Sequence, residues 1–197
     1  ILGAAAEKRG LECLSRFVAR LDSVPPERIR VVATNALRQA KNANDFISRA
    51  NKILPKPIEI IAGREEARLI YLGVSHTNAS SDKRLVIDIG GGSTEFIIGQ
   101  EFDPLLTESL QMGCVAFTQK YFADGLITKD AFNNAISAAR KEVLAINGRY
   151  QKVGWSSVVG SSGTIKAVRN VLVSKGWADE QERITYKGVK KLEKLLL

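Results

Sequence analysis

The sequence is poor in the side chains from which most covalent and metal-based catalytic sites are built. Its 197 residues include one histidine, His76, and two cysteines, Cys13 and Cys114. A single histidine excludes histidine-based metal clusters and makes Ser-His-Asp or Cys-His catalysis depend on one residue, which we expect on the surface. The cysteines lie far apart among apolar neighbours, so we expect reduced, buried thiols, which favours a cytoplasmic protein.

The sequence also lacks long apolar runs. Those it has are short, such as residues 85–87, far below the ~20 residues of a membrane-spanning helix, and no segment resembles a signal peptide. Aromatic residues make up 7% of the chain and do not alternate with basic residues, which argues against specific nucleic-acid binding. The only methionine is Met112 and the chain begins with Ile1, so we expect an internal part of a longer polypeptide.

The composition is otherwise that of a globular protein with a basic excess. Hydrophobic residues form 45% and charged residues 25% of the chain, which excludes a disordered or fibrous protein. Lys and Arg outnumber Asp and Glu by 29 to 21, giving a net charge of +8. Such an excess attracts polyanions, including polyphosphate, nucleotides and nucleic acid, although an inert basic surface explains it equally well.

Apolar periodicity alternates between helical and strand patterns along the chain. The first part predicts helices over 4–22, 34–38, 44–54 and 64–77, and strands over 28–33 and 58–62. The polar segment 78–82 is the expected linker between two domains. The second part predicts strands over 84–89, 94–99, 104–111 and 155–159, and helices over 114–122 and 129–147, near 164–174 and over 186–197. The expected class is therefore α/β with a mixed sheet.

The strongest local motif is a run of three glycines between two acids. Asp88 lies near the end of one expected strand, Gly90, Gly91, Gly92 and Ser93 form the turn, and Glu95 begins the next strand. Three residues without a Cβ let backbone N–H groups converge on an anion, so the turn is a candidate phosphate cradle. Asp88 is a candidate Mg²⁺ ligand beside it. The alternative is a plain glycine hairpin with two solvated acids.

A second candidate anion site lies where an apolar strand runs into a helix. The connecting residues are Ser161, Ser162, Gly163 and Thr164. The free N–H groups and positive end of the helix suit a phosphate, and simple helix capping is about as good an explanation. Arg38 ends a short turn after another strand, where its guanidinium is placed to bind phosphate oxygens or to remain solvated.

Two adjacent acids, Glu65 and Glu66, open the expected helix over 64–77. Acids in a first helical turn are favoured by the helix dipole, which is the default explanation. Neighbouring helical positions point about 100° apart, so only one of the two can face a cleft and take a proton from water. Glu66 directly precedes the buried-face residue Ala67 and is the better candidate.

Taken together, these motifs resemble the exopolyphosphatase and guanosine pentaphosphate phosphohydrolase (Ppx/GppA) family, with more likeness to the exopolyphosphatases. The resemblance rests on residues 10–14, 33–38, 60–71, 85–95, 111–114 and 160–164. It implies two ribonuclease-H-like domains of the actin, hsp70 and sugar-kinase superfamily, with mixed sheets and flanking helices. Residues 1–78 would be the C-terminal part of phosphatase domain I, and residues 79–197 the N-terminal and central part of domain II.

The resemblance also implies a reaction, which is Mg²⁺-dependent hydrolysis of the terminal phosphoanhydride of inorganic polyphosphate. By this resemblance Glu66 is the catalytic base, Arg38 a phosphate ligand, and Asp88 and Glu95 the acids serving metal and water. Residues 90–93 would form the phosphate loop and residues 161–164 a second one. The full-length protein is expected to form a homodimer without a membrane span.

Three alternatives remain open on the sequence. The same cleft could remove the 5′ γ-phosphate from pppGpp, guanosine 5′-triphosphate 3′-diphosphate. An actin-like module could hold ATP without turning it over, and a purely electrostatic polyanion binder would not depend on Glu66.

Members of the family begin with a strand carrying an Asp-x-Gly-Ser-Asn loop, which this chain does not show. Both domains are therefore expected to be incomplete, and the 197 residues alone to be poorly active.

Overall fold

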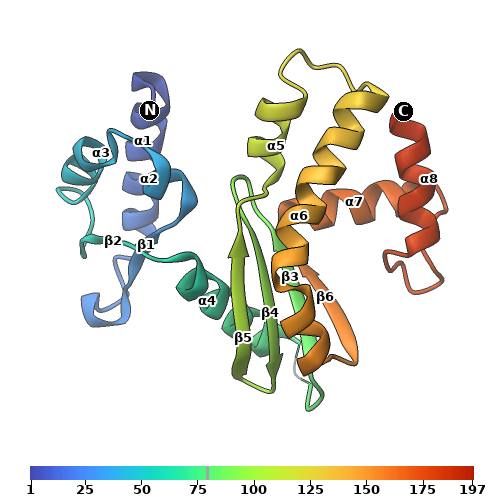
Figure 1. Ribbon diagram of the computed structural model, residues 1–197. Helices are drawn as coiled ribbons and strands as arrows, with labels where there is room; N and C mark the ends of the chain where they lie inside the picture. The colour runs from blue at the N-terminus through green and yellow to red at the C-terminus, as the bar shows by residue number, and fades with distance from the viewer. Residues whose placement is uncertain (79) are drawn as a thin grey trace. The chain divides into compact units, whose positions relative to one another are not determined.

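The computed structural model describes residues 1–78 and 80–197, which form two compact units, Ile1–Gly63 and Arg64–Leu197 (Figure 1). The units divide earlier than the linker expected at residues 78–82, of which Ala79 lies outside the described residues. The reason is that the helix expected at the end of the first domain buries its apolar face in the second unit. The assignment of the two parts to phosphatase domains remains a prediction.

The first unit is a small α/β body with a two-stranded parallel sheet. Its elements are α1 (Ala4–Arg20), a 3₁₀ turn η1 (Pro26–Arg28), β1 (Val31–Ala33), α2 (Asn35–Gln39), α3 (Ala43–Ala50) and β2 (Ile58–Ile60). Strands β1 and β2 pair in parallel with Val31 opposite Ile58. Helix α1 approaches α3 closely at Gly10, where a Cβ would lie 3.1 Å from the Phe46 ring. The apolar face of α3 is therefore buried against α1.

The second unit is built on a four-stranded mixed sheet. Its elements are α4 (Gly63–Thr77), β3 (Arg84–Ile89), β4 (Thr94–Gln100), β5 (Asp103–Leu110), α5 (Cys114–Tyr121), α6 (Lys129–Val153), β6 (Ser157–Ser161), α7 (Ser162–Ser174) and α8 (Tyr186–Leu196). The strand order is β5-β4-β3-β6. The first three strands form the expected antiparallel meander, and β6 pairs in parallel with β3. The α/β class with mixed sheets and flanking helices is confirmed.

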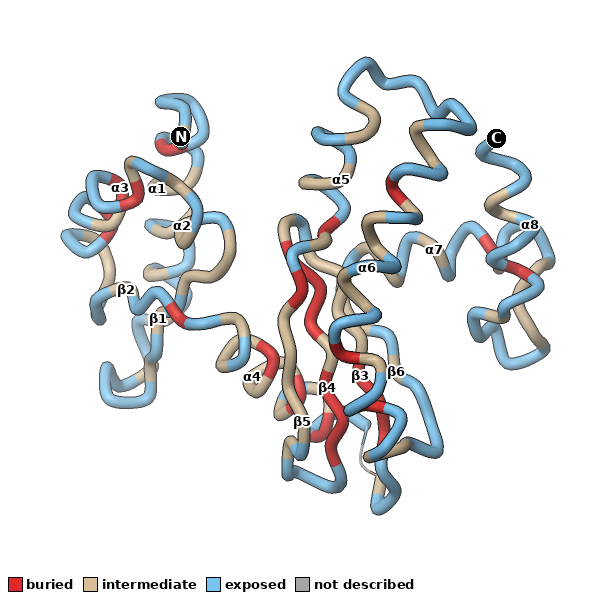
Figure 2. Tube along the Cα trace, in the orientation of Figure 1, coloured by how far each residue is buried: buried red, intermediate tan, exposed pale blue. Residues whose placement is uncertain are grey.

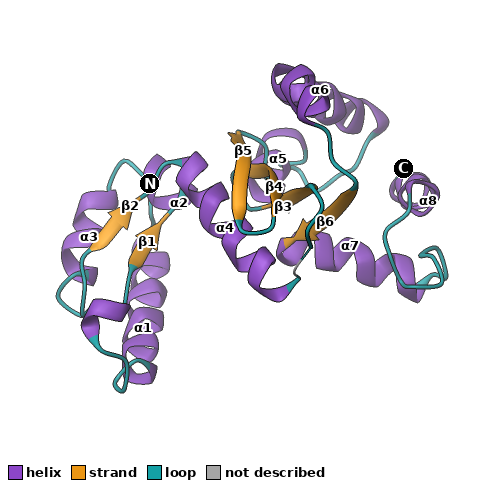
Figure 3. Cartoon of the chain, turned by 90° about the horizontal axis from the view of Figure 1, so that it is seen from below, coloured by secondary structure: helices purple, strands orange, loops and turns teal. Residues whose placement is uncertain are grey.

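Each face of this sheet has its own apolar core. On one face Val86 and Ile97 pack with Ala67 and Tyr71 of α4, and all four are fully buried. On the other face Leu85 and Ile98 pack with Ile146 and Tyr150 of α6. Because side chains alternate along a strand, the two helices cover opposite faces, as Figure 3 shows. Figure 2 shows the buried residues concentrated in the central strands.

Several expectations about single residues can be checked against the fold. His76 is exposed, as predicted. Both cysteines are free, but the predicted burial is wrong for Cys114, the first residue of α5, which is exposed, and Cys13 is only half-buried. Helix α6 runs on to Val153, past the predicted end at residue 147, because Ile146 and Tyr150 continue its buried face. No helix within residues 1–78 and 80–197 is long and apolar enough to cross a membrane.

Candidate functional site

A row of polar residues crosses the sheet of the second unit near the carboxyl ends of β3 and β6. Asp88 of β3 pairs with Glu95 of β4 and with Ser161 of β6, and Glu95 pairs in turn with Ser109 of β5. Directly paired residues place their side chains on the same face of a sheet. The two acids of the glycine motif and two serines therefore share one face.

The same face is covered by α4 one row further along the strands. There Val86 and Ile97, two residues before Asp88 and two after Glu95, are packed under Ala67. Glu66 directly precedes Ala67 in the helix, is half-buried, and lies near enough to Glu95 for its charge to raise the pKa of that carboxyl. Glu66 therefore lies where the apolar contact of α4 gives way to the polar row.

Glu65, the other acid of the pair, has a different role. Both of its carboxylate oxygens accept hydrogen bonds from Arg68 in the same helix, at 2.7 and 2.9 Å. This bidentate pair lies within one helical turn, which is a common arrangement for an acid in an exposed first turn. The choice of Glu66 as the catalytic carboxylate remains a prediction.

Glu95 is a buried acid in an unfavourable environment for its charge. Only 1% of the residue is exposed. Burial raises the pKa of its carboxyl above the ordinary value, hydrogen bonds from Ser93 and Ser109 oppose the shift, and the negative charges of Glu66 and Asp88 add to it. The three acids therefore form one electrostatic group, in which a cation or a shared proton relieves the mutual repulsion.

The glycine turn packs against Gly113 so closely that a side chain would not fit at Gly113. A Cβ on Gly113 would lie 2.5 Å from the backbone of Gly91. The N–H of Cys114 donates to the carbonyl of Gly90 and that of Val115 to the carbonyl of Gly91, both at 2.9 Å. The first turn of α5 thus holds the carbonyl groups of the glycine turn.

Most N–H groups of the turn, unlike these carbonyl groups, have no partner among the described residues. That of Gly90 donates to the carbonyl of Ser93 at 3.0 Å. The N–H groups of Gly91, Gly92 and Ser93 donate to no acceptor within the described part of the chain. An anion is a natural acceptor for backbone amides without a protein partner.

The second loop lies beside the first. Ser162 opens α7 with a φ of 84°, a left-handed conformation that is strained for a residue with a side chain. Its hydroxyl donates to the carbonyl of Ile89 at 2.9 Å, directly before the glycine turn. Ser161, the residue before α7, makes no side-chain capping bond. Helix α7 therefore begins next to the end of β3.

The predicted site residues divide between the two units. Glu66, Asp88, Glu95 and both loops, residues 90–93 and 161–164, belong to the second unit. Arg38 lies in the last turn of α2 in the first unit, where its Nη1 donates to the carbonyl of Ile61. Its expected role as a phosphate ligand remains a prediction.

The acids of the row meet part of what Mg²⁺ requires of its ligands. Among the described residues, no group of three or more His, Cys, Asp or Glu side chains is arranged to hold a metal ion. Mg²⁺ at phosphate sites is commonly held by one or two carboxylates, with phosphate and water oxygens completing the octahedron. Asp88 and Glu95, paired across β3 and β4, supply two carboxylates. The donor set fits an ion that arrives with a phosphate rather than one caged by protein alone.

Ser109 and Glu108, two neighbouring residues of β5, were not predicted from the sequence. Ser109 donates a hydrogen bond to Glu95, and Glu108 accepts hydrogen bonds from Arg64 and Arg149. The available signal was strand alternation, because it assigns residues 108 and 109 to opposite faces once the register of β4 and β5 is known.

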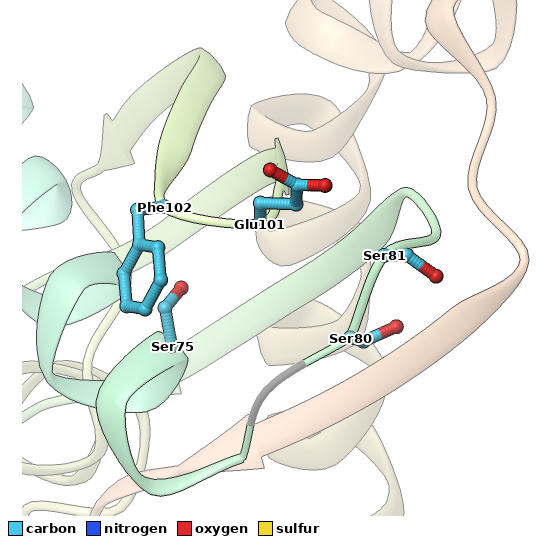
Figure 4. Close-up of a pocket in the computed structure, with 5 residues that line it drawn as sticks. All are labelled: Ser75, Ser80, Ser81, Glu101 and Phe102. Carbon is cyan, nitrogen blue, oxygen red and sulfur yellow. The ribbon is translucent and has the colours of Figure 1, made fainter.

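A cavity lies at the end of the sheet opposite the acid row, and none of the predicted site residues lines it. It has a volume of about 340 Å³ and is lined by Ser75, Ser80, Ser81, Glu101 and Phe102 (Figure 4). Glu101 and Phe102 belong to the turn between β4 and β5, whereas the glycine turn joins β3 to the opposite end of β4. This cavity is therefore separate from the acid row.

The chain was compared with known proteins. It is 44% identical over 193 residues to a guanosine-5′-triphosphate,3′-diphosphate pyrophosphatase of Photobacterium profundum, which covers 98% of this chain and 38% of that protein. It is 47% identical over 174 residues to a Haemophilus influenzae protein named "Putative exopolyphosphatase", covering 88% of this chain and 54% of that protein. The chain thus spans about half the length of these relatives or less, and their names divide between two activities.

The fold has a counterpart among solved structures. The Ppx/GppA enzyme of Aquifex aeolicus superimposes with a TM-score of 0.74 at 25% identity, covering 98% of this chain and 64% of that one. A model of the Ppx/GppA phosphatase family matches residues 1–197. The glycine turn, the paired acids and the carboxylate of α4 all lie within the matched region. The chain belongs to the Ppx/GppA phosphatase family.

Proposed function

We propose that this chain is part of a phosphoanhydride hydrolase that removes the terminal phosphate of a polyphosphorylated substrate, with pppGpp as the first candidate. The observation that carries the proposal is the grouping of Glu66, Asp88 and Glu95 beside a turn with three amides, those of residues 91–93, that have no acceptor among the described residues. Phosphoryl transfer depends on positioning and charge neutralisation more than on a covalent partner, so this combination suits it.

Each part of the site has a distinct role in the proposal. The amides of Gly91, Gly92 and Ser93 bind oxygens of the terminal phosphate, and the second loop binds phosphate from the adjacent strand end. Glu66 orients the attacking water toward phosphorus and accepts its proton. Asp88 and Glu95 hold Mg²⁺, which when bound neutralises charge on the phosphate oxygens.

The choice of pppGpp rests on the relatives. The match that covers 98% of this chain is to a protein named for pppGpp, and the match to the exopolyphosphatase-named protein covers 88%. The names therefore favour pppGpp over polyphosphate, which the sequence analysis placed first. Polyphosphate remains the second candidate, because the identity to the second protein is 47% and the net charge of +8 suits a long polyanion.

The experiment replaces one carboxylate of the pair at the start of α4 at a time. In the full-length protein, Glu66→Gln should lower turnover by roughly 10²- to 10⁴-fold, the range for loss of a general base, and leave substrate binding largely intact. Glu65→Gln is the matched control, because Glu65 is paired with Arg68, and it should stay near the wild-type rate. Phosphate release is measured with pppGpp and polyphosphate, separately and in competition, with and without EDTA.

The outcomes separate the hypotheses. Normal turnover of the Glu66→Gln protein would remove Glu66 from the mechanism. Tight ATP binding without turnover of either substrate would favour the actin-like binding module instead. Binding that falls steeply with salt and is unaffected by the Glu66 change, with no hydrolysis, would favour a purely electrostatic polyanion binder.

A further inference from the structure

Glu108 of β5 is held by arginines from the two helices that cover the sheet. In the first turn of α4, Arg64 places Nη2 3.0 Å from Oε1 of Glu108 and Nε 3.3 Å from Oε2. From α6, Arg149 places Nη2 2.8 Å from Oε1. The Glu108 side chain is only 12% exposed, so its charge is largely withdrawn from water and matched by two guanidinium groups.

The two arginines bind the same carboxylate but belong to different helices, Arg64 to α4 and Arg149 to α6. Arg149 belongs to α6, which packs on the face of Leu85 and Ile98 and carries none of the predicted site residues. Arg64 stands two positions before Glu66 in the first turn of α4. Of these two contacts, that of Arg64 ties the turn that carries Glu66 to the edge strand of the sheet.

The residue next to Glu108 in β5 contacts Glu95, the buried acid of the site. Glu108 and Ser109 are consecutive, so their side chains point to opposite faces of the sheet. Ser109 donates a hydrogen bond to Oε1 of Glu95 at 2.8 Å. One short piece of β5 is thus bonded to Glu95 on one face and to the first turn of α4 through Glu108.

We propose that Arg64 is a positioning residue: its bidentate contact with Glu108 fixes the first turn of α4, so that the Glu66 carboxylate keeps its place relative to Glu95. This inference rests on the proposed function, because it concerns the same site. Arg64 acts through Glu66. A point charge at this position is insufficient, since two parallel N–H groups are needed to fix the direction of the turn.

The two arginines are alike in how far their ion pairs can stabilise the protein. The Arg64 side chain is 68% exposed and that of Arg149 is 56% exposed, so solvent screens both ion pairs to a similar degree and each adds little to stability. A displacement of about 1 Å at a reacting group, in contrast, costs up to roughly 100-fold in rate. The two arginines should therefore differ in catalysis while remaining alike in stability.

The test compares Arg64→Ala, Arg64→Lys and Arg149→Ala in the full-length protein, with Glu66→Gln as reference. For phosphate release from pppGpp, Arg64→Ala should lower kcat by about 10- to 100-fold with KM within about twofold of the wild type. Arg64→Lys should recover only part of the loss, because an ammonium group cannot form the bidentate contact. Arg149→Ala should stay within about twofold in both constants, and thermal unfolding of the two alanine variants should be similar.

Each contrary result has one meaning. Equal kcat for Arg64→Ala and Arg149→Ala overturns the inference, because Glu108 would then be only a structural anchor. A raised KM with unchanged kcat for Arg64→Ala also overturns it, since Arg64 would then bind substrate. If Glu66→Gln keeps normal turnover, the proposed function itself fails. If Glu66→Gln is inactive and Arg64→Ala resembles the wild type, only the positioning role is lost.

Discussion

The hydroxyl of Ser109 on β5 donates a 2.8 Å hydrogen bond to Oε1 of Glu95 on β4, directly across the ladder. This contact joins the edge strand to the most deeply buried acid of the candidate site, which is 1% exposed. Burial disfavours the charged form of Glu95, and the Ser109 hydroxyl partly offsets this because it binds the carboxylate. Protein stability should therefore depend on pH through this pair.

The first prediction concerns Glu95 in metal-free buffer. Folding raises the pKa of the Glu95 carboxyl above its ordinary value of 4.5. At a pH between these two pKa values, Glu95 is ionised in the unfolded chain and protonated in the folded one. Stability from this group is therefore fully present at low pH and is lost as pH rises through the folded pKa. Glu95→Gln should remove this loss and make the free energy of unfolding higher than wild type near pH 8.

The matched change at Ser109 should act in the opposite direction. Ser109→Ala removes a hydrogen bond to the carboxylate, which costs about 1.5–3 kcal/mol when the acceptor is charged and less when it is neutral. Its cost should therefore grow with pH. Urea unfolding from pH 4 to 8 with EDTA present measures both variants, and parallel curves for wild type and Glu95→Gln would contradict the assignment.

The second prediction concerns the contact between Gly113 and the glycine turn. A Cβ at Gly113 would lie 2.5 Å from backbone atoms of Gly91 and Gly92, which cannot move aside as a flexible side chain would. Gly113→Ala should therefore cost about 1–3 kcal/mol of stability and weaken binding of inorganic phosphate. The measurements are thermal unfolding and phosphate titration.

Gly148→Ala is the matched control for that change. Gly148 lies within α6, and a Cβ there would meet nothing within 4 Å. The alanine should stabilise the protein by about 0.5–1 kcal/mol and leave phosphate binding alone. A Gly113→Ala protein as stable as the Gly148→Ala protein would show that the close packing of the turn is absent in solution.

The third prediction concerns the attachment of α4 to the second unit. Tyr71 is fully buried, and its ring packs on Gly99 of β4 so closely that a Cβ on Gly99 would lie 2.2 Å from Cζ of Tyr71. The Tyr71 hydroxyl donates a hydrogen bond to the carbonyl of Glu101 at 3.1 Å. Tyr71→Ala should destabilise the second unit by about 3–5 kcal/mol. Tyr71→Phe removes only the hydrogen bond and should cost about 0.5–1.5 kcal/mol.

Hydrogen exchange at the amides of β3 and β4 locates that loss. Faster exchange of these strands in the Tyr71→Ala protein would confirm that α4 completes the second unit. Unchanged exchange in the sheet, with loss confined to residues 1–63, would instead favour the boundary near residue 78 that the sequence indicated.

Much of the site was predictable because its signals are local. Periodicity located each helix and strand of the second unit to within a few residues, because an amphipathic element must bury one face. The triple glycine, its two flanking acids and the Gly/Ser/Thr turn before α7 are readable for the same reason, since each depends on residues adjacent in the chain. The choice of Glu66 over Glu65 also followed from its place beside the buried Ala67.

What only the tertiary structure decided is the set of relationships between strands. Strand alternation is the one local signal at Ser109 and Glu108. They matter because the register of β4 and β5 places one against Glu95 and the other within reach of Arg64. The assignment of α4 to the second unit depends likewise on Tyr71 meeting Gly99, far away in sequence. Composition and periodicity determine which faces must be buried, but which face is buried against which is decided by packing of the whole chain.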